Sequence, residues 1–102
     1  MERREKIELN DTIELMKSDD FKKRFKAEYY QLEIRCEKLA DMIEKYKEGK
    51  LNFKPSTPIE ILEEQLKHMR EYLWILEERS FMEEINLFVM DIGKKAVLYD
   101  LR

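Results

Sequence analysis

The chain has 102 residues, enough for one small domain and too few for two. Its 20 Lys and Arg against 23 Asp and Glu give a net charge of −3, so a general duplex-DNA binder, which usually carries a basic excess, is not expected. With two glycines and two prolines the chain has few turns and should be mostly helical. A single cysteine excludes an intramolecular disulfide. No apolar run reaches the roughly 18 residues that a membrane span requires.

Residues 1–17 are expected to form a short charged helix with an apolar edge of Ile7, Ile13 and Met16. The first nine residues lack the apolar stretch of a signal peptide, which, together with the lone cysteine, favours a cytosolic protein. The Ser-Asp-Asp sequence at 18–20 is typical of a helix start, since it offers capping oxygens and acids to the first turn.

The first long helix is expected over residues 19–48. Its apolar residues recur every three or four positions, which is the period of one face of a helix. They are Phe21, Phe25, Tyr29, Leu32, Cys36, Leu39, Ile43 and Tyr46. Gly49 is the expected stop, because glycine readily adopts the left-handed conformation that ends many helices.

The second long helix is expected over residues 58–84, after a loop at 50–57. Thr57 is expected to cap it, with Pro58 in the first helical position and Glu60 completing a capping box. Its apolar stripe, again in steps of three and four, comprises Leu62, Leu66, Met69, Leu73, Leu76 and Ser80. Because the loop is short, the two long helices should pair antiparallel as a hairpin.

The last segment, residues 85–102, has two interpretations. Short apolar runs flank Gly93 and Lys94, so the segment forms either a small β-hairpin or a helix broken at Gly93. We favour an ordered arm that packs on another element or another subunit. The predicted fold class is therefore all-α, a long antiparallel helical hairpin with a short N-terminal helix and a C-terminal arm, in one domain over residues 1–102.

Some apolar residues lie away from the two main stripes, notably Tyr30, Ile34 and Trp74. One interpretation is that they cover the N-terminal helix or the C-terminal arm. The other is a second packed face, and hence a homo-oligomer. The two are compatible, and because so small a chain buries only a modest fraction of its surface, we expect a homo-oligomer.

The sequence contains no evident catalytic constellation. His68 is the only histidine and has Glu64 one turn before it, but two ligands do not make a metal site, so an ion pair on the helix surface is favoured. Cys36 lies on the core stripe and is expected to be a small buried hydrophobe. Both glycines stand alone, so a Gly-rich phosphate loop is absent. We expect no enzyme, no metal and no cofactor.

The remaining chemistry is a mixture of cations and aromatic rings. The segment FKKRFK at residues 21–26 places four cations beside two rings, and further cations follow on the same helix. Ring faces stack on bases and cations bind phosphates, which makes this pattern a candidate nucleotide site. The alternative is that the rings are core and the cations face solvent. The candidate residues on this helix are Phe21, Lys22, Arg24, Arg35 and Lys38.

Residues 21–43 (FKKRFKAEYYQLEIRCEKLADMI) and 63–80 (EEQLKHMREYLWILEERS) resemble a family of small phage proteins related to those of crAss-like phages. In the first segment an aromatic residue opens the helix, and Arg35 precedes the Lys38-Leu39 pair. The second segment carries a Gln-Met-Tyr-Leu-Arg line at helical spacing, formed by Gln65, Met69, Tyr72, Leu76 and Arg79. The resemblance covers residues 18–84, leaves 85–102 outside as the arm, and extends to the anti-CBASS sponges that sequester cyclic oligonucleotides.

The resemblance implies a phage anti-defence protein that binds cyclic di- and trinucleotides between protomers and does no chemistry on them. A second messenger of CBASS-type immunity is thereby kept from its effector, in the cytoplasm of the infected bacterial host. By position, Phe21 matches a base-stacking tyrosine, Arg35 or Lys38 a phosphate-binding residue, and Arg79 or Arg70 an arginine of a second pocket. The implied partners are the cyclic oligonucleotide and other copies of the chain, with a hexamer as in the best-known sponges; duplex DNA and membranes are not expected.

Two other functions fit the same sequence. A helical adaptor that inhibits a host protein would use the second face with Tyr30, Ile34 and Trp74. A structural or assembly part of a virion would also be served by an antiparallel helical hairpin.

Overall fold

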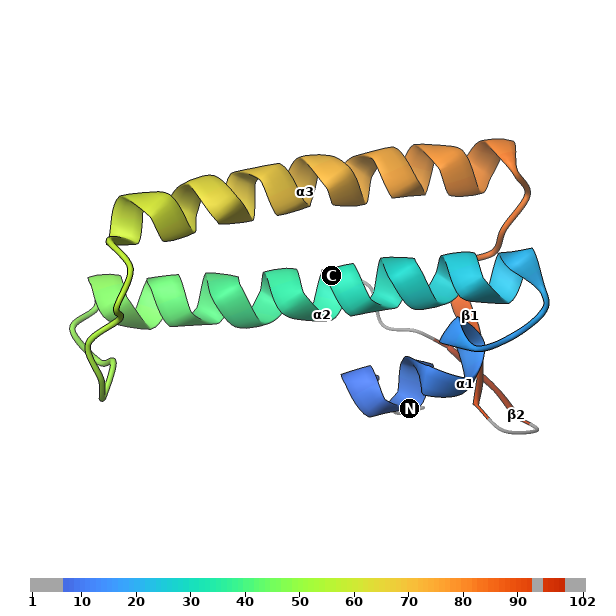
Figure 1. Cartoon of the computed structure of the whole chain (residues 1–102), viewed down its shortest axis with the longest axis horizontal. Coiled ribbons are helices and arrows are strands. Elements are labelled where there is room, and N and C mark those ends of the chain that lie inside the picture. Colours follow the sequence, from blue (N-terminus) through green and yellow to red (C-terminus); the bar gives the residue numbers. More distant parts are fainter. Residues whose placement is uncertain (1–6, 93–94, 99–102) are drawn as a thin grey trace, which may run out of the picture.

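The computed structural model describes residues 7–92 and 95–98, with side chains described over residues 7–88. Its elements, in chain order, are the 3-10 helix η1 (Leu9–Thr12), the helices α1 (Ile13–Met16), α2 (Phe21–Lys47) and α3 (Ile59–Met82), and the strands β1 (Val89–Ile92) and β2 (Lys95–Leu98). Figure 1 shows α2 and α3 side by side along the long axis, with η1, α1 and the strands on the side of α2 that faces away from α3.

The limits of α2 follow from its capping residues, as predicted. Asp20 has an extended backbone, and its carboxylate accepts a hydrogen bond of 2.9 Å from the N–H of Lys22. This satisfies one of the free N–H groups at the start of the helix. At the other end Gly49 adopts a φ of 71°, the left-handed conformation that ends a helix. The stop at Gly49 and a cap within 18–20 are confirmed. The cap is Asp20, so α2 begins at Phe21, two residues later than predicted, and its first turn contains no acidic residue.

The start of α3 differs from the prediction. The helix begins at Ile59 with Pro58 in the N-cap position, and no side chain caps it. Pro58 has an extended ψ of 143°, which moves the first helical residue one position beyond the expected one. The predicted capping box of Thr57 with Glu60 is therefore wrong, since its register assumed that Pro58 is already helical. The N–H groups of Ile61 and Leu62 both donate to the Pro58 carbonyl.

The hairpin is antiparallel, as cross-helix contacts near its two ends show. Near the loop, Lys47 Nζ lies 2.5 Å from the Glu63 carboxylate. Near the other end, the hydroxyl of Tyr29 donates to Glu77 at 2.7 Å. Between these contacts the two predicted stripes form an apolar seam around Cys36, Ile43 and Leu66, packed with Leu39, Leu62 and Met69. The predicted pairing of the long helices is confirmed.

A second apolar cluster lies around the N-terminal half of α2, includes Leu76 of α3, and holds the segments that precede α2 and follow α3 against it. Ile7, Leu15, Ile34, Ile85 and Leu87 are all buried there, together with Tyr30. The Tyr30 hydroxyl donates to the Leu87 carbonyl at 2.9 Å. Tyr30 and Ile34 therefore cover the N-terminal helix and the segment after α3, as one of the two interpretations proposed.

The residues of the N-terminal helix that pack against this cluster differ from the predicted ones. Ile7 is buried, but Ile13 and Met16 are 38% and 49% exposed, and Leu15 packs inward. The reason is that the helix starts late, at Leu9, and changes from 3-10 to α geometry at Ile13, which rotates its apolar edge. The prediction was correct for the element and wrong for two of its three core residues.

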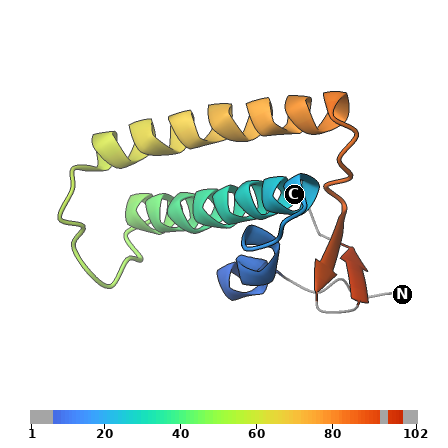
Figure 2. The ribbon, with the colours of Figure 1, turned by 45° about the vertical axis from the view of Figure 1, so that its right-hand side comes forward.

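The segment after α3 contains a short two-stranded ribbon. β1 and β2 pair antiparallel, with Val89 opposite Leu98 and Ile92 opposite Lys95. This is the β-hairpin alternative, and the alternative of a broken helix is wrong; Gly93 and Lys94 lie outside the described residues. The helical architecture predicted for the rest of the chain is confirmed. In Figure 2 the strands β1 and β2 lie beside the N-terminal end of α2.

Candidate ligand-binding site

The seven candidate residues lie in three places on the hairpin. Four of them, Phe21, Lys22, Arg24 and Arg79, come from the end where α2 begins and α3 finishes. Arg35 and Lys38 lie further along α2, and with a rise of about 1.5 Å per residue Arg35 is roughly 20 Å from Phe21 along the helix. Arg70 lies near the middle of α3. One chain therefore does not bring all seven together.

The first place, which we call the head cluster, consists of Phe21, Lys22, Phe25 and Arg79. The ring of Phe21 lies 6.2 Å from that of Phe25, and the two planes are tilted by 59°. The Arg79 guanidinium lies over the Phe25 ring, 4.9 Å from its centroid, in a cation–π contact. Phe25 is 2% exposed and Phe21 is 47% exposed. Phe25 is thus core, whereas a face of Phe21 is open to a ligand.

The cations of the head cluster have weak partners at the surface. Arg79 Nε donates to the Glu83 carboxylate at 2.9 Å, and both side chains are partly exposed. Lys22 Nζ donates to the backbone carbonyl of Glu84 at 3.3 Å. Exposed contacts of this kind contribute about 0–1 kcal/mol. A ligand phosphate can therefore displace them at little cost.

Arg24 makes a contact outside the head cluster, and its role in ligand binding stays a prediction. Its guanidinium donates to the Ser18 carbonyl at 2.8 Å, across the turn between α1 and α2. It thus points toward the turn and satisfies the Ser18 carbonyl, which lies just beyond the end of α1. In this arrangement Arg24 stabilises the turn and does not belong to the head cluster.

The second place lies along α2 and contains two exposed cations. Within residues 7–88, Arg35 makes no hydrogen bond or ion pair. Lys38 lines an open groove of about 690 Å³ at the loop end of the hairpin, together with the half-exposed ring of Phe53. Lysines and carboxylates alternate around this groove, so its local charge is balanced. Its other charged residues are Asp41, Glu44, Lys45, Glu48 and Lys50.

The third place is a shallow depression of about 750 Å³ on α3, lined by Lys67, Arg70, Glu71, Trp74 and Ile75. Trp74 is 60% exposed. Within the described side chains, neither Lys67 nor Arg70 makes a polar contact. Sequence reasoning missed Lys67 and Trp74 as possible site residues, although the steps from 67 to 70 and from 70 to 74 already place both beside Arg70.

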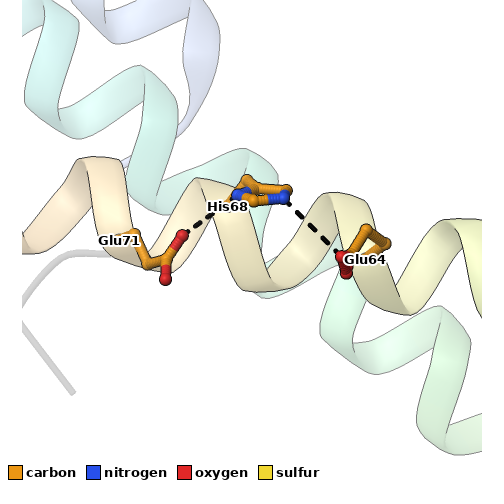
Figure 3. Close-up of polar contacts among 3 residues, drawn as sticks. All are labelled: Glu64, His68 and Glu71. Atoms are coloured by element: carbon orange, nitrogen blue, oxygen red, sulfur yellow. Dashed lines mark hydrogen bonds and ion pairs between the residues drawn. The ribbon is translucent and has the colours of Figure 1, made fainter.

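His68 pairs with two of the carboxylates that lie about one helical turn from Lys67, whereas no residue three or four positions from Arg70 is acidic. Its Nδ1 lies 3.0 Å from Glu71, and its Nε2 lies 3.7 Å from Glu64 (Figure 3). Both carboxylates therefore turn to His68, which they flank at one helical turn on either side. The expectation that His68 forms a surface ion pair is confirmed. Across the described residues, no three His, Cys, Asp or Glu side chains converge as a metal ion would require.

Cys36 lies in the apolar seam of the hairpin, 7% exposed. Burial raises the pKa of its thiol, Glu33 adds to the rise, and the positive charge of Arg70 opposes it. A thiol in this state is protonated and unreactive at neutral pH. The predicted role as a buried hydrophobe is confirmed.

Among the described helices, none combines the length and the apolar character of a membrane span.

The geometry defines a helical-hairpin protein with an open aromatic ring and loosely held cations at its head. The profile of the Sequestin family matches residues 19–82, and the chain belongs to this family. The match falls within the predicted range of 18–84, and the family name fits the predicted resemblance to sequestering proteins. Comparisons with curated proteins and with solved structures gave no match.

Proposed function

We propose that the protein sequesters cyclic di- and trinucleotide second messengers and thereby blocks CBASS-type immunity in the cytoplasm of a phage-infected bacterium. The observation that carries this proposal is the Sequestin match over residues 19–82, the segment that contains all seven candidate residues. The family name supports a sequestering role. The resemblance to the anti-CBASS sponges and the chemistry of the head cluster support the choice of ligand.

The head cluster has the groups that such a ligand needs. A cyclic dinucleotide presents two bases and two phosphates, so it requires flat apolar surfaces and cations close together. The open face of Phe21 would stack on a base, while Arg79 and Lys22 would exchange their weak surface contacts for a phosphate. Binding of this kind involves no bond making or breaking, so we propose that the protein is not an enzyme.

The separation of the candidate residues supports a pocket between protomers. Arg35 lies roughly 20 Å along the helix from Phe21, so the two can serve one small ligand only when they come from different chains. A symmetric oligomer presents the same ring and the same cation from each copy, which suits a ligand with internal symmetry. We therefore propose a homo-oligomer, with a hexamer as the assembly that the resemblance suggests.

A thermal-shift experiment tests the proposed function. The purified protein is heated with a panel of cyclic di- and trinucleotides and with the corresponding linear forms. A ligand at one hundred times its dissociation constant stabilises the folded state by about 2.7 kcal/mol. We expect one cyclic nucleotide to raise Tm and its linear form to leave Tm unchanged. If no member of the panel raises Tm, the proposal is wrong.

Matched variants locate the site within the same assay. Arg79→Ala and Phe21→Ala should reduce the shift strongly, whereas Phe21→Tyr should keep it because the stacking face is retained. Lys54→Ala is the control, since Lys54 is an exposed cation in the loop far along the hairpin from the head cluster. An undiminished shift in both alanine variants would place the ligand elsewhere, with Arg35 and Lys38 as the next residues to replace.

A helical adaptor that binds a host protein is the second candidate function. The observation in its favour is the exposure of Trp74 and Phe81, which are 60% and 87% exposed. Contiguous patches of exposed apolar side chains often mark interaction surfaces. This function predicts that no cyclic nucleotide raises the Tm of the protein.

A further inference from the structure

The side of α3 that faces away from α2 carries an exposed apolar stripe. It consists of Trp74, Ile75, Phe81 and Met82, which are 60%, 49%, 87% and 74% exposed, and we call it the outer stripe. Trp74 and Ile75 are neighbours, and Phe81 and Met82 follow them seven residues later, which is two helical turns. All four side chains therefore lie on one face of the helix. In Figures 1 and 2 the other helices and the strands lie on the opposite side of α3. The hairpin thus has a second face of the kind that packs against another helix.

The size of the outer stripe fits an interface. With aromatic side chains of roughly 150–250 Å² each, the four residues expose on the order of 500 Å² of apolar surface. Patches of about 300–600 Å² are the largest on typical monomers and are often functional. A symmetric pair would cover the stripe on both chains, on the order of 1,000 Å² before flanking charges are counted, which approaches a specific interface.

The charged residues on the same face of α3, of which Glu78 lies between Trp74 and Phe81, indicate the occupant of the outer stripe. Lys67 and Arg70 precede Trp74, whereas Glu78 follows it, and within the described side chains none of these three has a polar partner. Arg70 and Glu78 each lie four residues from Trp74, about 6 Å along the axis in opposite directions. A second α3 in antiparallel orientation would bring each Arg70 level with the partner's Glu78. A parallel copy would instead set like charges against each other.

We propose that the outer stripe binds a second copy of this chain, with the two α3 helices antiparallel and centred on Trp74. Arg70 then pairs with the partner's Glu78, and Phe81 lies near the partner's Lys67. This assigns Arg70 to the interface between copies. The head cluster contains none of the proposed interface residues and stays open to ligand. All residues of the proposed interface belong to α3, and the interface does not depend on the identity of any ligand.

Sedimentation equilibrium of the full chain tests the assembly. We expect a dimer or a higher even-numbered oligomer, and Trp74→Glu should weaken its dissociation constant about a hundredfold or more, because the change occurs twice across a symmetric centre. Phe53→Glu is the control, since Phe53 is 54% exposed in the loop outside the outer stripe. Circular dichroism confirms that both variants fold, as expected for exposed positions.

A charge swap tests the orientation separately. Arg70→Glu and Glu78→Arg should each weaken the assembly at least tenfold at low salt, and the double variant should recover most of the loss because the pairs are re-formed with opposite sign. A monomeric wild-type chain, or an assembly unaffected by Trp74→Glu, would overturn the proposal and leave the stripe to a different protein. Failure of the double variant to recover would overturn the antiparallel orientation.

Discussion

Replacement of Tyr30 by phenylalanine tests how the segment after α3 is held against α2. Tyr30 is fully buried, and its hydroxyl donates to the Leu87 carbonyl at 2.9 Å. Phenylalanine keeps the ring in place but removes this donor. A buried carbonyl left without its partner costs about 1–3 kcal/mol, and a loss of about 2 kcal/mol lowers Tm by roughly 10 °C in a domain of this size.

Urea denaturation, followed by circular dichroism, measures the change in the free energy of unfolding. The matched control is Tyr46→Phe, because Tyr46 lies on the same helix but is 45% exposed and should change the stability by less than about 0.5 kcal/mol. If Tyr30→Phe is as stable as Tyr46→Phe, the hydrogen bond from Tyr30 to Leu87 does not hold the segment after α3 against α2.

Four further changes test the helix ends and the buried thiol. Asp20→Ala removes the cap of α2 and should lower the free energy of unfolding by about 1 kcal/mol, whereas Asp20→Ser should retain most of it. Gly49→Ala should also cost about 1 kcal/mol, although no atom blocks a Cβ there, because a φ of 71° disfavours alanine. Glu84→Gly should stabilise by about 0.5–1 kcal/mol, since Glu84 holds a φ of 56° after α3; an unchanged urea midpoint would contradict either glycine prediction. Because burial, with a smaller effect of Glu33, raises the pKa of Cys36, the folded state keeps a proton that the unfolded chain loses, so stability should fall as the pH rises above about 8.5 and fall less in Cys36→Ala.

The helices and the hairpin could be predicted from the sequence because their causes are local. A three-and-four spacing of apolar residues defines a helical stripe wherever it occurs, and Asp20 and Gly49 act on groups within four residues of themselves. A short loop between two such stripes leaves antiparallel pairing as the direct solution. The error at Thr57 has a local cause as well, since one extended residue at Pro58 shifts the start of α3.

The residues of the candidate site could be predicted from the sequence only in part. The sequence indicated the ring of Phe21 and the cations around it, but not that Arg79 would lie over Phe25, because these residues are far apart in the chain and meet through the packing of α3 on α2. Arg24 belongs to the same basic segment, yet the turn at Ser18 directs it away from the cluster. Side-chain direction at a helix start depends on the path of the preceding chain, which periodicity does not describe.

The sequence alone determined that this chain is a charged, amphipathic helical hairpin with two apolar stripes and further apolar residues outside them. Which of those outer residues are buried was decided by the tertiary structure. Tyr30 and Trp74 are equivalent by pattern, but Tyr30 is covered by residues from both ends of the chain and Trp74 remains 60% exposed. The physical reason is that burial depends on which distant segment packs on a face, and that packing is a property of the whole chain.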